Sequence, residues 1–357
     1  MLIQKETSLL VIKNMRIFIF APFFINTNSN FLNGFIGGSP EQVYKLAISH
    51  IKDGNDVAVC TLKIPGSVES ELYRGIKIIR IGEINGKIEL DLNEVGKTIL
   101  DYKPDVYIQF FVGSGKGEKM LELIPKITKT LPCKVLVRFG SSKDVDNLST
   151  ISKLILNKVT TILVNSTMVS SFIKKVPNGK YRVVENKVDV HSFKKVSDLD
   201  KLLLRKKYKV SDKSFVVLFV GRFVEKKGVL DLTKALNDIP YNYRILGFFV
   251  GEERGDLLKG KIGCLNELQK LSKTSPGRFK TIGPLSHDVM PEIYNLADLF
   301  CLPSKVEGLS NALLEAEACG LDLLVSNIKE NIRPSSEIIH NLPRQIIKKY
   351  TESRYNI

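Results

Sequence analysis

The stretch Leu299–Gly320 reads LFCLPSKVEGLSNALLEAEACG, and its pattern decides which fold the chain can adopt. An apolar run of strand length leads through a polar loop into an apolar run of helical length, as parallel sheets covered by helices require. Glu307 falls in the loop and Glu315 in the helix, with seven residues between them. Two carboxylates so placed could accept hydrogen bonds from the sugar and ribose hydroxyl groups of one ligand. The alternative is that Glu315 and Glu317 are solvent-facing helix residues.

The same stretch offers backbone donors where its helix begins. The first N–H groups of a helix have no partner within the helix, so they attract anions and other acceptors. The residues expected at this turn are Gly308, Leu309, Ser310 and Asn311. A ligand site is therefore expected where the strand ends and the helix starts.

Apolar runs of strand length alternate with amphipathic stretches along the whole chain, which predicts the α/β fold class. Strands are expected at Arg16–Ala21, Asp56–Thr61, Ile76–Ile81, Asp105–Phe111, Lys134–Phe139, Thr160–Val164, Tyr181–Val184, Phe215–Val220, Tyr243–Val250, Phe279–Ile282, Leu299–Leu302 and Asp322–Val325. A polar stretch at His191–Ser214 separates the two halves. We expect one domain over residues 15–195, a second over 205–335, and a C-terminal helix over 336–357 that could cross back to the first domain. Doubly wound sheets bind ligands at the carboxyl ends of their strands, so a ligand is expected in the cleft between the domains.

Composition narrows the class of protein. The 357 residues are 43% hydrophobic, which suffices for two cores. No apolar run approaches the roughly 20 residues of a membrane span, and Leu9–Ile12 is too brief for a signal peptide, so a soluble cytoplasmic protein is expected. The net charge of +15 should attract phosphates, anionic lipid surfaces or nucleic acid, unless it is simply solvated lysine. The basic residues form no long tract with interleaved aromatics, and the five cysteines lie far apart, so neither a nucleic-acid partner nor a zinc site is expected.

A second motif places two cations after a strand. Val216–Gly228 reads VVLFVGRFVEKKG, so a buried-type strand is followed by Arg222 and Lys227. The forked guanidinium and the compact ammonium together suit a diphosphate and could offset negative charge on a leaving group. An ordinary basic turn between strand and helix is the alternative.

A third motif places glycines before a helix. Gly34–Gln42 reads GFIGGSPEQ, and a helix is expected from Pro40 to about residue 52, with Ser39 as its N-cap. Gly37 and Gly38 would let an anion approach the backbone there. A glycine turn that feeds a well-capped helix is the alternative.

In order and approximate spacing, GGSPEQ, GRFVEKKG and EGLSNALLE resemble the motifs of the retaining GT-B glycosyltransferases of family four, the glycosyl transferases group 1. The connecting segments that resemble this family are Glu185–Asp189, Arg205–Tyr208, Ala297–Ser304 and Ala318–Gly320. The resemblance implies a GT-B fold, with two Rossmann-like doubly wound domains that face a cleft. The first domain would bind the acceptor and the second the nucleotide sugar.

The resemblance also implies an activity, transfer of a hexosyl-type sugar from a UDP or GDP sugar with retention and without a metal or other cofactor. In it, Arg222 and Lys227 hold the diphosphate, Glu307 the donor sugar and Glu315 the ribose. Backbone groups would assist toward the donor, those of Gly37, Gly38, Gly308, Leu309, Ser310 and Asn311. The segment Ile282–Leu285, which contains Gly283, would lie beside the base. The acceptor could be a glycan, a lipid-linked sugar or a protein, and attachment to the anionic inner face of a membrane is part of the family's habit.

Two departures from the family favour a second hypothesis, a catalytically silent GT-B protein that binds a nucleotide sugar or acts as a scaffold. The usual donor-contacting histidine is absent after the strand that ends at Phe139, where Arg138 or Ser141 could take its place. The C-terminus looks shortened, because Asn327 leads directly to an expected helix at Ser335–Tyr350. A nucleic-acid binder is a third hypothesis that rests on charge alone.

Several other patterns favour ordinary structure. Gly113–Gly117 lacks the first glycine and the final Ser or Thr of a P-loop, and Asp144–Asp146 is too short to define a metal site. The histidines His50, His191, His287 and His340 lack ligand spacing, so surface or capping roles are expected. The segment Glu118–Thr130 could be a membrane-surface helix, although a helix packed on the sheet is favoured.

Overall fold

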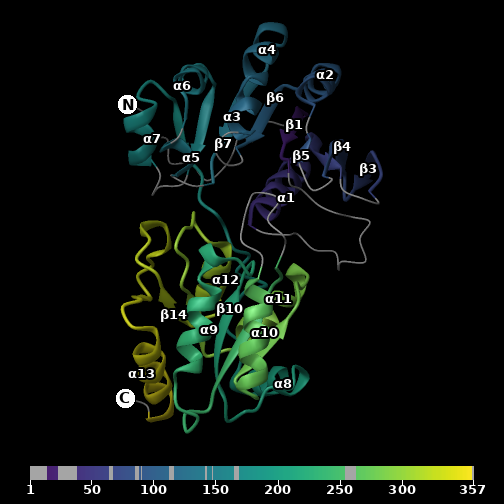
Figure 1. The fold of residues 1–357 in the computed structure, drawn as a ribbon. Helices are drawn as coiled ribbons and strands as arrows, with labels where there is room; N and C mark the ends of the chain where they lie inside the picture. Colours follow the sequence, from purple (N-terminus) through teal and green to yellow (C-terminus); the bar gives the residue numbers. More distant parts are fainter. Residues whose placement is uncertain are drawn as a thin grey trace. The chain divides into compact units, whose positions relative to one another are not determined.

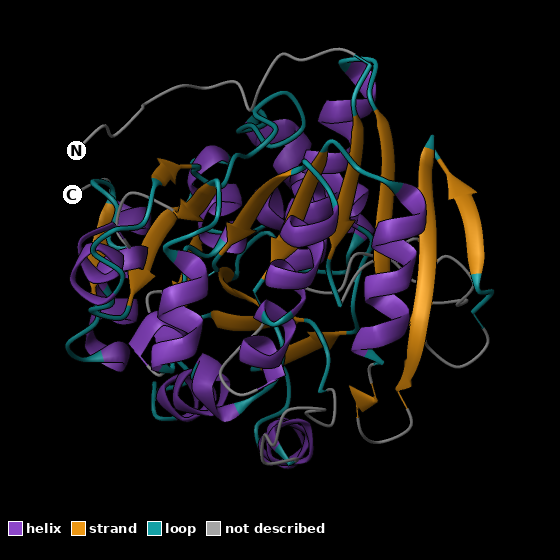
Figure 2. Ribbon diagram, turned by 90° about the horizontal axis from the view of Figure 1, so that it is seen from above, coloured by secondary structure: helices purple, strands orange, loops and turns teal. Residues whose placement is uncertain are grey.

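The computed structural model of the chain describes residues 14–22, 38–63, 67–84, 88–89, 91–111, 116–140, 143–146, 148–164, 169–253 and 263–355 (Figure 1). The chain divides into two compact units, Met1–Asn186 and Lys187–Ile357. The division lies upstream of residue 195, where the first domain was expected to end. Strands and helices alternate along both units, so the predicted α/β class is confirmed (Figure 2).

The first unit is built on a sheet with the strand order β3-β4-β2-β1-β6-β7-β8-β9, in which β5 also pairs with β4. Its strands are β1 (Arg16–Phe20), β2 (Asp56–Lys63), β3 (Ser70–Tyr73), β4 (Ile76–Ile84), β5 (Ile88–Glu89), β6 (Val106–Phe110), β7 (Lys134–Arg138), β8 (Thr161–Val164) and β9 (Tyr181–Val183). Only β3 and β5 run antiparallel to β4 among the described pairs.

Helices cover both faces of this sheet, which explains its apolar strands. They are α1 (Gly38–Lys52), α2 (Leu92–Tyr102), α3 (Lys116–Leu121), α4 (Leu123–Thr130), α5 (Lys143–Asp146), α6 (Thr150–Leu156) and α7 (Val169–Lys175). Successive residues of β1 point to opposite faces: Phe18 packs in the cluster that holds Ile99 of α2, and Ile19 in the cluster that holds Val43 of α1.

The second unit has a wholly parallel sheet in the order β12-β11-β10-β13-β14-β15. Its strands are β10 (Phe215–Val220), β11 (Ile245–Val250), β12 (Phe279–Ile282), β13 (Leu299–Leu302), β14 (Asp322–Val325) and β15 (Ser336–Ile338). Its helices are α8 (Asp198–Lys207), α9 (Val229–Asn237), α10 (Cys264–Thr274), α11 (Met290–Leu296), α12 (Asn311–Ala318) and α13 (Leu342–Tyr355), with short 3-10 turns η2 (Glu225–Lys227), η3 (His287–Val289) and η4 (Lys329–Asn331). Numbered within the unit, the strand order is 3-2-1-4-5-6, the Rossmann order.

The chain after β14 differs from the prediction. A continuous helix over Ser335–Tyr350 was expected, but residues 336–338 form the edge strand β15, which pairs in parallel with β14. Three half-buried residues are too few to show a strand period, so this strand was missed. The C-terminal unit therefore keeps an edge strand that the sequence suggested was lost.

The C-terminal helix α13 packs within the second unit. Ile346 is fully buried in the cluster that holds Phe215 and Val217 of β10. Tyr350 meets the ring of Phe215 edge-on, with the centroids 5.9 Å apart. The sequence left open a crossing to the first domain, and the described part of the helix, up to residue 355, contributes its apolar face to the second unit.

The segment considered as a membrane-surface helix belongs to the first core. It breaks into α3 and α4, and Met120, Leu121, Ile124 and Ile127 are all buried there. The packed alternative is thus confirmed. Among the described residues, none of the helices combines the length and the apolar character that crossing a bilayer would take.

Candidate active site

The second sheet brings the predicted site loops to one place. Its strands are parallel, so all their carboxyl ends lie at one edge, and the strand order reverses between β10 and β13. Ligands of open α/β sheets bind at such a switch point. The loop after β10 carries Arg222 and Lys227, and the loop after β13 carries Glu307. The topology therefore brings the loop that carries Arg222 and Lys227 beside the loop that carries Glu307, 80 positions after Lys227.

Lys227 and Glu307 form an ion pair between these two loops. Lys227 Nζ donates to Glu307 Oε1, which also accepts from the hydroxyl of Ser304 at 2.9 Å. The two side chains are only 20% and 8% exposed. A partly buried carboxylate needs such donors, because its desolvation is otherwise unfavourable. The pair thus fixes the ammonium group of Lys227 between the loops that follow β10 and β13.

A glycine lets the two loops come this close. Gly228 has φ +70°, and a Cβ at this position would lie 2.0 Å from the carbonyl oxygen of Pro303. Next to it, the backbone N–H of Lys305 donates to the carbonyl of Lys226 at 2.8 Å. Only glycine combines this backbone conformation with this contact. The glycine that ends GRFVEKKG is therefore required by the packing against the loop after β13.

Gly228→Ala is expected to lower the free energy of unfolding by about 2–4 kcal/mol, because the new methyl group overlaps the Pro303 carbonyl and the backbone is strained. Chemical denaturation followed by circular dichroism measures this. Gly277→Ala is the matched control, since Gly277 has φ +76° with nothing within 4 Å of its Cβ position. The control should lose only about 1 kcal/mol. Equal losses in both variants would show that the Pro303 contact contributes nothing.

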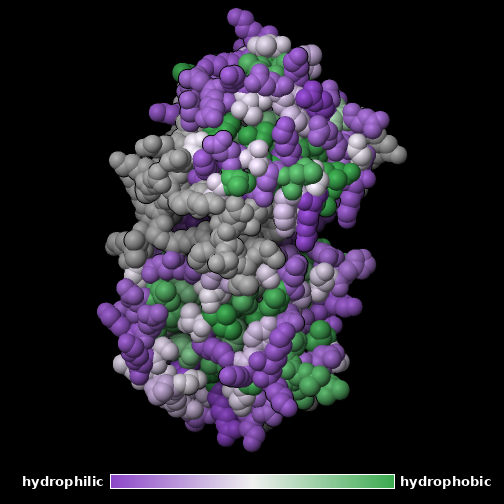
Figure 3. Space-filling model, turned by 90° about the vertical axis from the view of Figure 1, so that its right-hand side faces the viewer, coloured by the Kyte–Doolittle hydropathy of each residue, from purple (hydrophilic) through white to green (hydrophobic). Residues whose placement is uncertain are grey.

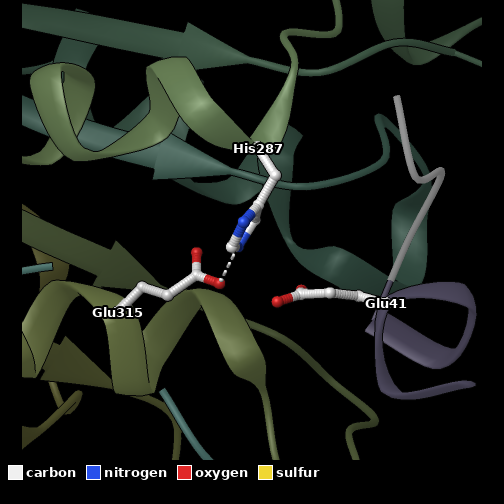
Figure 4. Close-up of side chains that lie close together, drawn as sticks. All are labelled: Glu41, His287 and Glu315. Atoms are coloured by element: carbon white, nitrogen blue, oxygen red, sulfur yellow. Dashed lines mark hydrogen bonds and ion pairs between the residues drawn. The ribbon is translucent and has the colours of Figure 1, made fainter. Parts of the chain in front are cut away.

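Glu315 is buried and does not face solvent. Glu315 is only 4% exposed. Its Oε1 accepts a hydrogen bond from His287 Nε2 at 2.9 Å (Figure 4), and its Oε2 accepts one from the hydroxyl of Tyr294 at 2.8 Å. Glu41, also drawn in Figure 4, belongs to α1 of the first unit. Each carboxylate oxygen can accept a second hydrogen bond. Glu315 is thus held in one orientation and keeps acceptor capacity for a hydroxyl group.

Sequence reasoning missed both residues that orient Glu315. His287 was expected on the surface or in a cap, yet it bonds Glu315 and packs its ring 5.0 Å from that of Phe193. Tyr294 was not singled out, because a tyrosine in an amphipathic helix is usually core. His50 also departs from expectation, since it is only 5% exposed at the end of α1. The contacts of His287 and Tyr294 with Glu315 arise from the tertiary fold, so the spacing of these residues in the sequence could not predict them.

Glu317 has a structural role on the same helix. Arg333 Nε donates to its Oε2 at 2.9 Å, and the hydroxyl of Ser335 donates to its Oε1 at 2.8 Å. Both partners lie in the connection between η4 and β15. Glu315 and Glu317 therefore point to different surroundings, and only Glu315 is held among aromatic side chains at the site.

The remaining predicted residues of the second unit lie on the expected elements. Arg222 is half-buried in the turn after β10. Helix α12 begins at Asn311 with Ser310 as its N-cap, preceded by Gly308 and Leu309, and the Ser310 side chain makes no capping hydrogen bond. Gly283 follows β12 and has open space at its Cβ position.

The structure describes only some of the residues of the first unit for which a role was predicted. Gly37 and Ser141 lie outside the described residues, and Gly38 already begins α1, so this helix starts two residues before the expected Pro40. The predicted role of both glycines toward a diphosphate stays a prediction. Arg138, one of the two residues considered in place of the family's histidine, ends β7, and its Nη2 donates to Asn186 Oδ1 at 3.0 Å. Burial lowers the pKa of Arg138 to about 10, partly offset by the charge of Glu185, so it stays cationic at neutral pH.

The second unit is similar in sequence to a known protein family. Residues 185–348 match the family model described as Glycosyl transferases group 1. The alpha-galactosylglucosyldiacylglycerol synthase of Streptococcus pneumoniae is 24% identical over 168 residues, which are 47% of this chain and 43% of that protein. The chain therefore spans less than half the length of that curated relative.

Solved structures resemble the whole chain. The sucrose-phosphate synthase of Thermosynechococcus elongatus superposes with a TM-score of 0.75 at 15% identity, over 95% of this chain and 89% of that one. The Anabaena protein HepE, in complex with UDP and glucose, superposes with a TM-score of 0.68 at 16% identity, over 96% and 91% of the chains. Residues 185–348, which include every predicted site residue of the second unit, thus match the model of glycosyl transferases group 1, and the chain has the two-domain, Rossmann-like GT-B fold.

Proposed function

We propose that this protein is a glycosyltransferase that moves a hexosyl-type sugar from a nucleoside diphosphate sugar to an acceptor, with retention of configuration and without a metal ion. The observation that carries the proposal is the Lys227–Glu307 pair at the switch point of the second sheet. The match of residues 185–348 to glycosyl transferases group 1 supports the same chemistry.

Each site residue has a role in this proposal. Lys227 and Arg222 bind oxygens of the diphosphate, and their charges stabilise the negative charge that grows as the bond between the sugar and the phosphate breaks. The N–H groups at the start of α12 add partial positive charge. Once the Lys227 side chain has turned from Glu307 to the phosphate, Glu307 accepts a hydrogen bond from a hydroxyl of the donor sugar. These groups supply the stabilisation that a divalent cation gives in other phosphoryl sites.

Glu315 takes the ribose. Its two carboxylate oxygens, which His287 and Tyr294 hold in place, accept hydrogen bonds from the two neighbouring ribose hydroxyls. Gly283 leaves room for the base, whether uracil or guanine. HepE binds UDP and glucose, which makes UDP-glucose the first donor to test.

The acceptor is proposed to be lipid-linked, ahead of a glycan or a protein. The Streptococcus pneumoniae relative is named for a diacylglycerol product. A cytoplasmic protein that attaches peripherally to an anionic membrane face would meet such an acceptor. The net charge of +15 supports this attachment.

Donor turnover tests the proposal. The full chain is incubated with UDP and GDP sugars, and nucleotide release is measured with and without excess EDTA. One donor should raise the melting temperature through binding to the native state and should be hydrolysed at a rate that EDTA leaves unchanged. Loss of turnover on chelation would refute the metal-independent mechanism, and the absence of both binding and turnover with every donor would refute the function.

A further inference from the structure

Helix α8 of the second unit carries its leucines on the outside. Leu199, Leu202 and Leu203 are 68%, 48% and 57% exposed, although leucine is normally buried. They lie three and four residues apart, so they share one face of the helix. Figure 3 looks onto the side of the second unit on which α8 lies in Figure 1, and hydrophobic side chains gather there among hydrophilic ones.

The opposite side of α8 holds the helix to the unit, with Leu204 packed against the core and two basic side chains bonded to the unit. Arg205 is 5% exposed, and its Nη2 donates to Asp298 Oδ2 at 2.6 Å while its Nε donates to the Leu296 carbonyl at 3.0 Å. Lys201 Nζ donates to the other oxygen of Asp298 at 2.7 Å. These bonds fix the rotation of the helix about its axis. The leucines therefore face outward, whereas the apolar face of an amphipathic helix usually faces the core.

The segment that carries α8 has more exposed lysines than exposed aspartates. The exposed charged residues between positions 187 and 213 are the lysines Lys187, Lys194, Lys195, Lys206, Lys207, Lys209 and Lys213 and the aspartates Asp189, Asp198, Asp200 and Asp212. Lysines thus outnumber aspartates around an apolar helix face. Apolar side chains that enter the headgroup layer and lysines that meet its phosphates are the two contributions to binding at an anionic membrane surface.

A groove runs beside the leucine face. Its volume is about 330 Å³. It is lined by Leu203, Leu204 and Pro291, by the ammonium groups of Lys194 and Lys207, by the carboxylates of Asp200 and Glu292, and by the polar side chains of Ser192 and Asn295. Lys207 also pairs with Glu292 at 2.5 Å, which positions its ammonium at the groove. The two carboxylates balance the two ammonium groups, so the groove itself carries no surplus of positive charge, and the lysine surplus lies in the rest of the segment.

We propose that the leucine face of α8 docks onto the surface of a bilayer rich in anionic phospholipids. This inference rests on the proposed function, which includes attachment to a membrane. It adds to that function by naming the surface that makes the attachment. It replaces the Glu118–Thr130 segment, whose apolar side chains are buried.

Co-sedimentation of the full chain with vesicles tests the docking surface. Vesicles of phosphatidylglycerol and phosphatidylcholine should bind the chain at low salt, and vesicles of phosphatidylcholine alone should bind it far less. The double variant Leu202→Gln/Leu203→Gln should weaken binding to the anionic vesicles by about tenfold or more. The matched control is Ile151→Gln/Leu154→Gln, because these residues of α6 are 67% and 57% exposed. The control should bind like the unchanged chain.

Three outcomes would overturn the docking proposal. They are unchanged vesicle binding by the α8 variant, an equal loss in the α6 control, and a dimer of the unchanged chain, seen by light scattering, that the α8 variant converts to monomer. The last would assign the leucine face to a second copy of the chain. Hydrolysis of the soluble donor should be the same in all variants, so a failure of membrane binding is distinguished from a failure of the proposed catalysis.

Discussion

Lys227→Ala is expected to lower kcat/KM for the donor by roughly a hundredfold to a thousandfold, because it removes a charge that stabilises the departing diphosphate. Nucleotide release under donor-limiting conditions measures the effect. Lys226→Ala is the control, since Lys226 is adjacent but exposed. If both variants turned over like the unchanged chain, the switch point would not be the donor site.

The same substitution also leaves Glu307 without its counter-charge. Its side chain is 8% exposed, and an unpaired buried charge destabilises a protein by about 3–5 kcal/mol. A loss of activity could then reflect unfolding. The double variant Lys227→Gln/Glu307→Gln removes both charges, so it should regain most of the melting temperature and remain inactive. Recovery of activity in the double variant would contradict a direct role for Lys227.

Glu315→Gln is expected to weaken the binding of UDP or GDP by roughly tenfold to a hundredfold. Glutamine keeps the size of the side chain, but its amide nitrogen cannot accept the bond that His287 or Tyr294 now donates. The side chain then leaves the orientation in which it meets the ribose. Isothermal titration with the free nucleotide measures the change.

Two comparisons make the Glu315 experiment specific. Glu317→Gln, on the same helix, should leave nucleotide affinity unchanged, because Glu317 bonds Arg333 and Ser335 instead. Inorganic pyrophosphate should bind the Glu315→Gln variant as it binds the unchanged chain, because it has no ribose. Equal weakening for pyrophosphate and nucleotide would show that Glu315 acts on the diphosphate or on folding.

Much of the fold could be predicted from the sequence because its strands are buried on both faces. Runs such as Phe215–Val220 are continuous and apolar, and each of the predicted strands overlaps an observed one. The strands that were missed, β3, β5 and β15, are short and lie at or beside sheet edges, where the apolar pattern is weak.

The site could be predicted only as a set of residues. Motif spacing indicated Lys227, Glu307 and Glu315, but it could not show that Lys227 and Glu307 pair with one another. Their contact depends on the strand order, which brings β10 beside β13. His287 and Tyr294 were missed for the same reason, because their roles arise from the packing of η3 and α11 near α12. Likewise, the inverted orientation of α8 follows from Asp298, a residue far away in the sequence.

The fixed carboxylate of Glu315 has a thermodynamic consequence. A glutamate side chain loses up to about 2 kcal/mol of rotational entropy when it becomes ordered. Tyr294 and His287 order this one when the second unit folds, before any nucleotide arrives. If the proposed ribose contact forms, nucleotide binding does not have to order this side chain, so part of the affinity for the nucleotide is determined during folding.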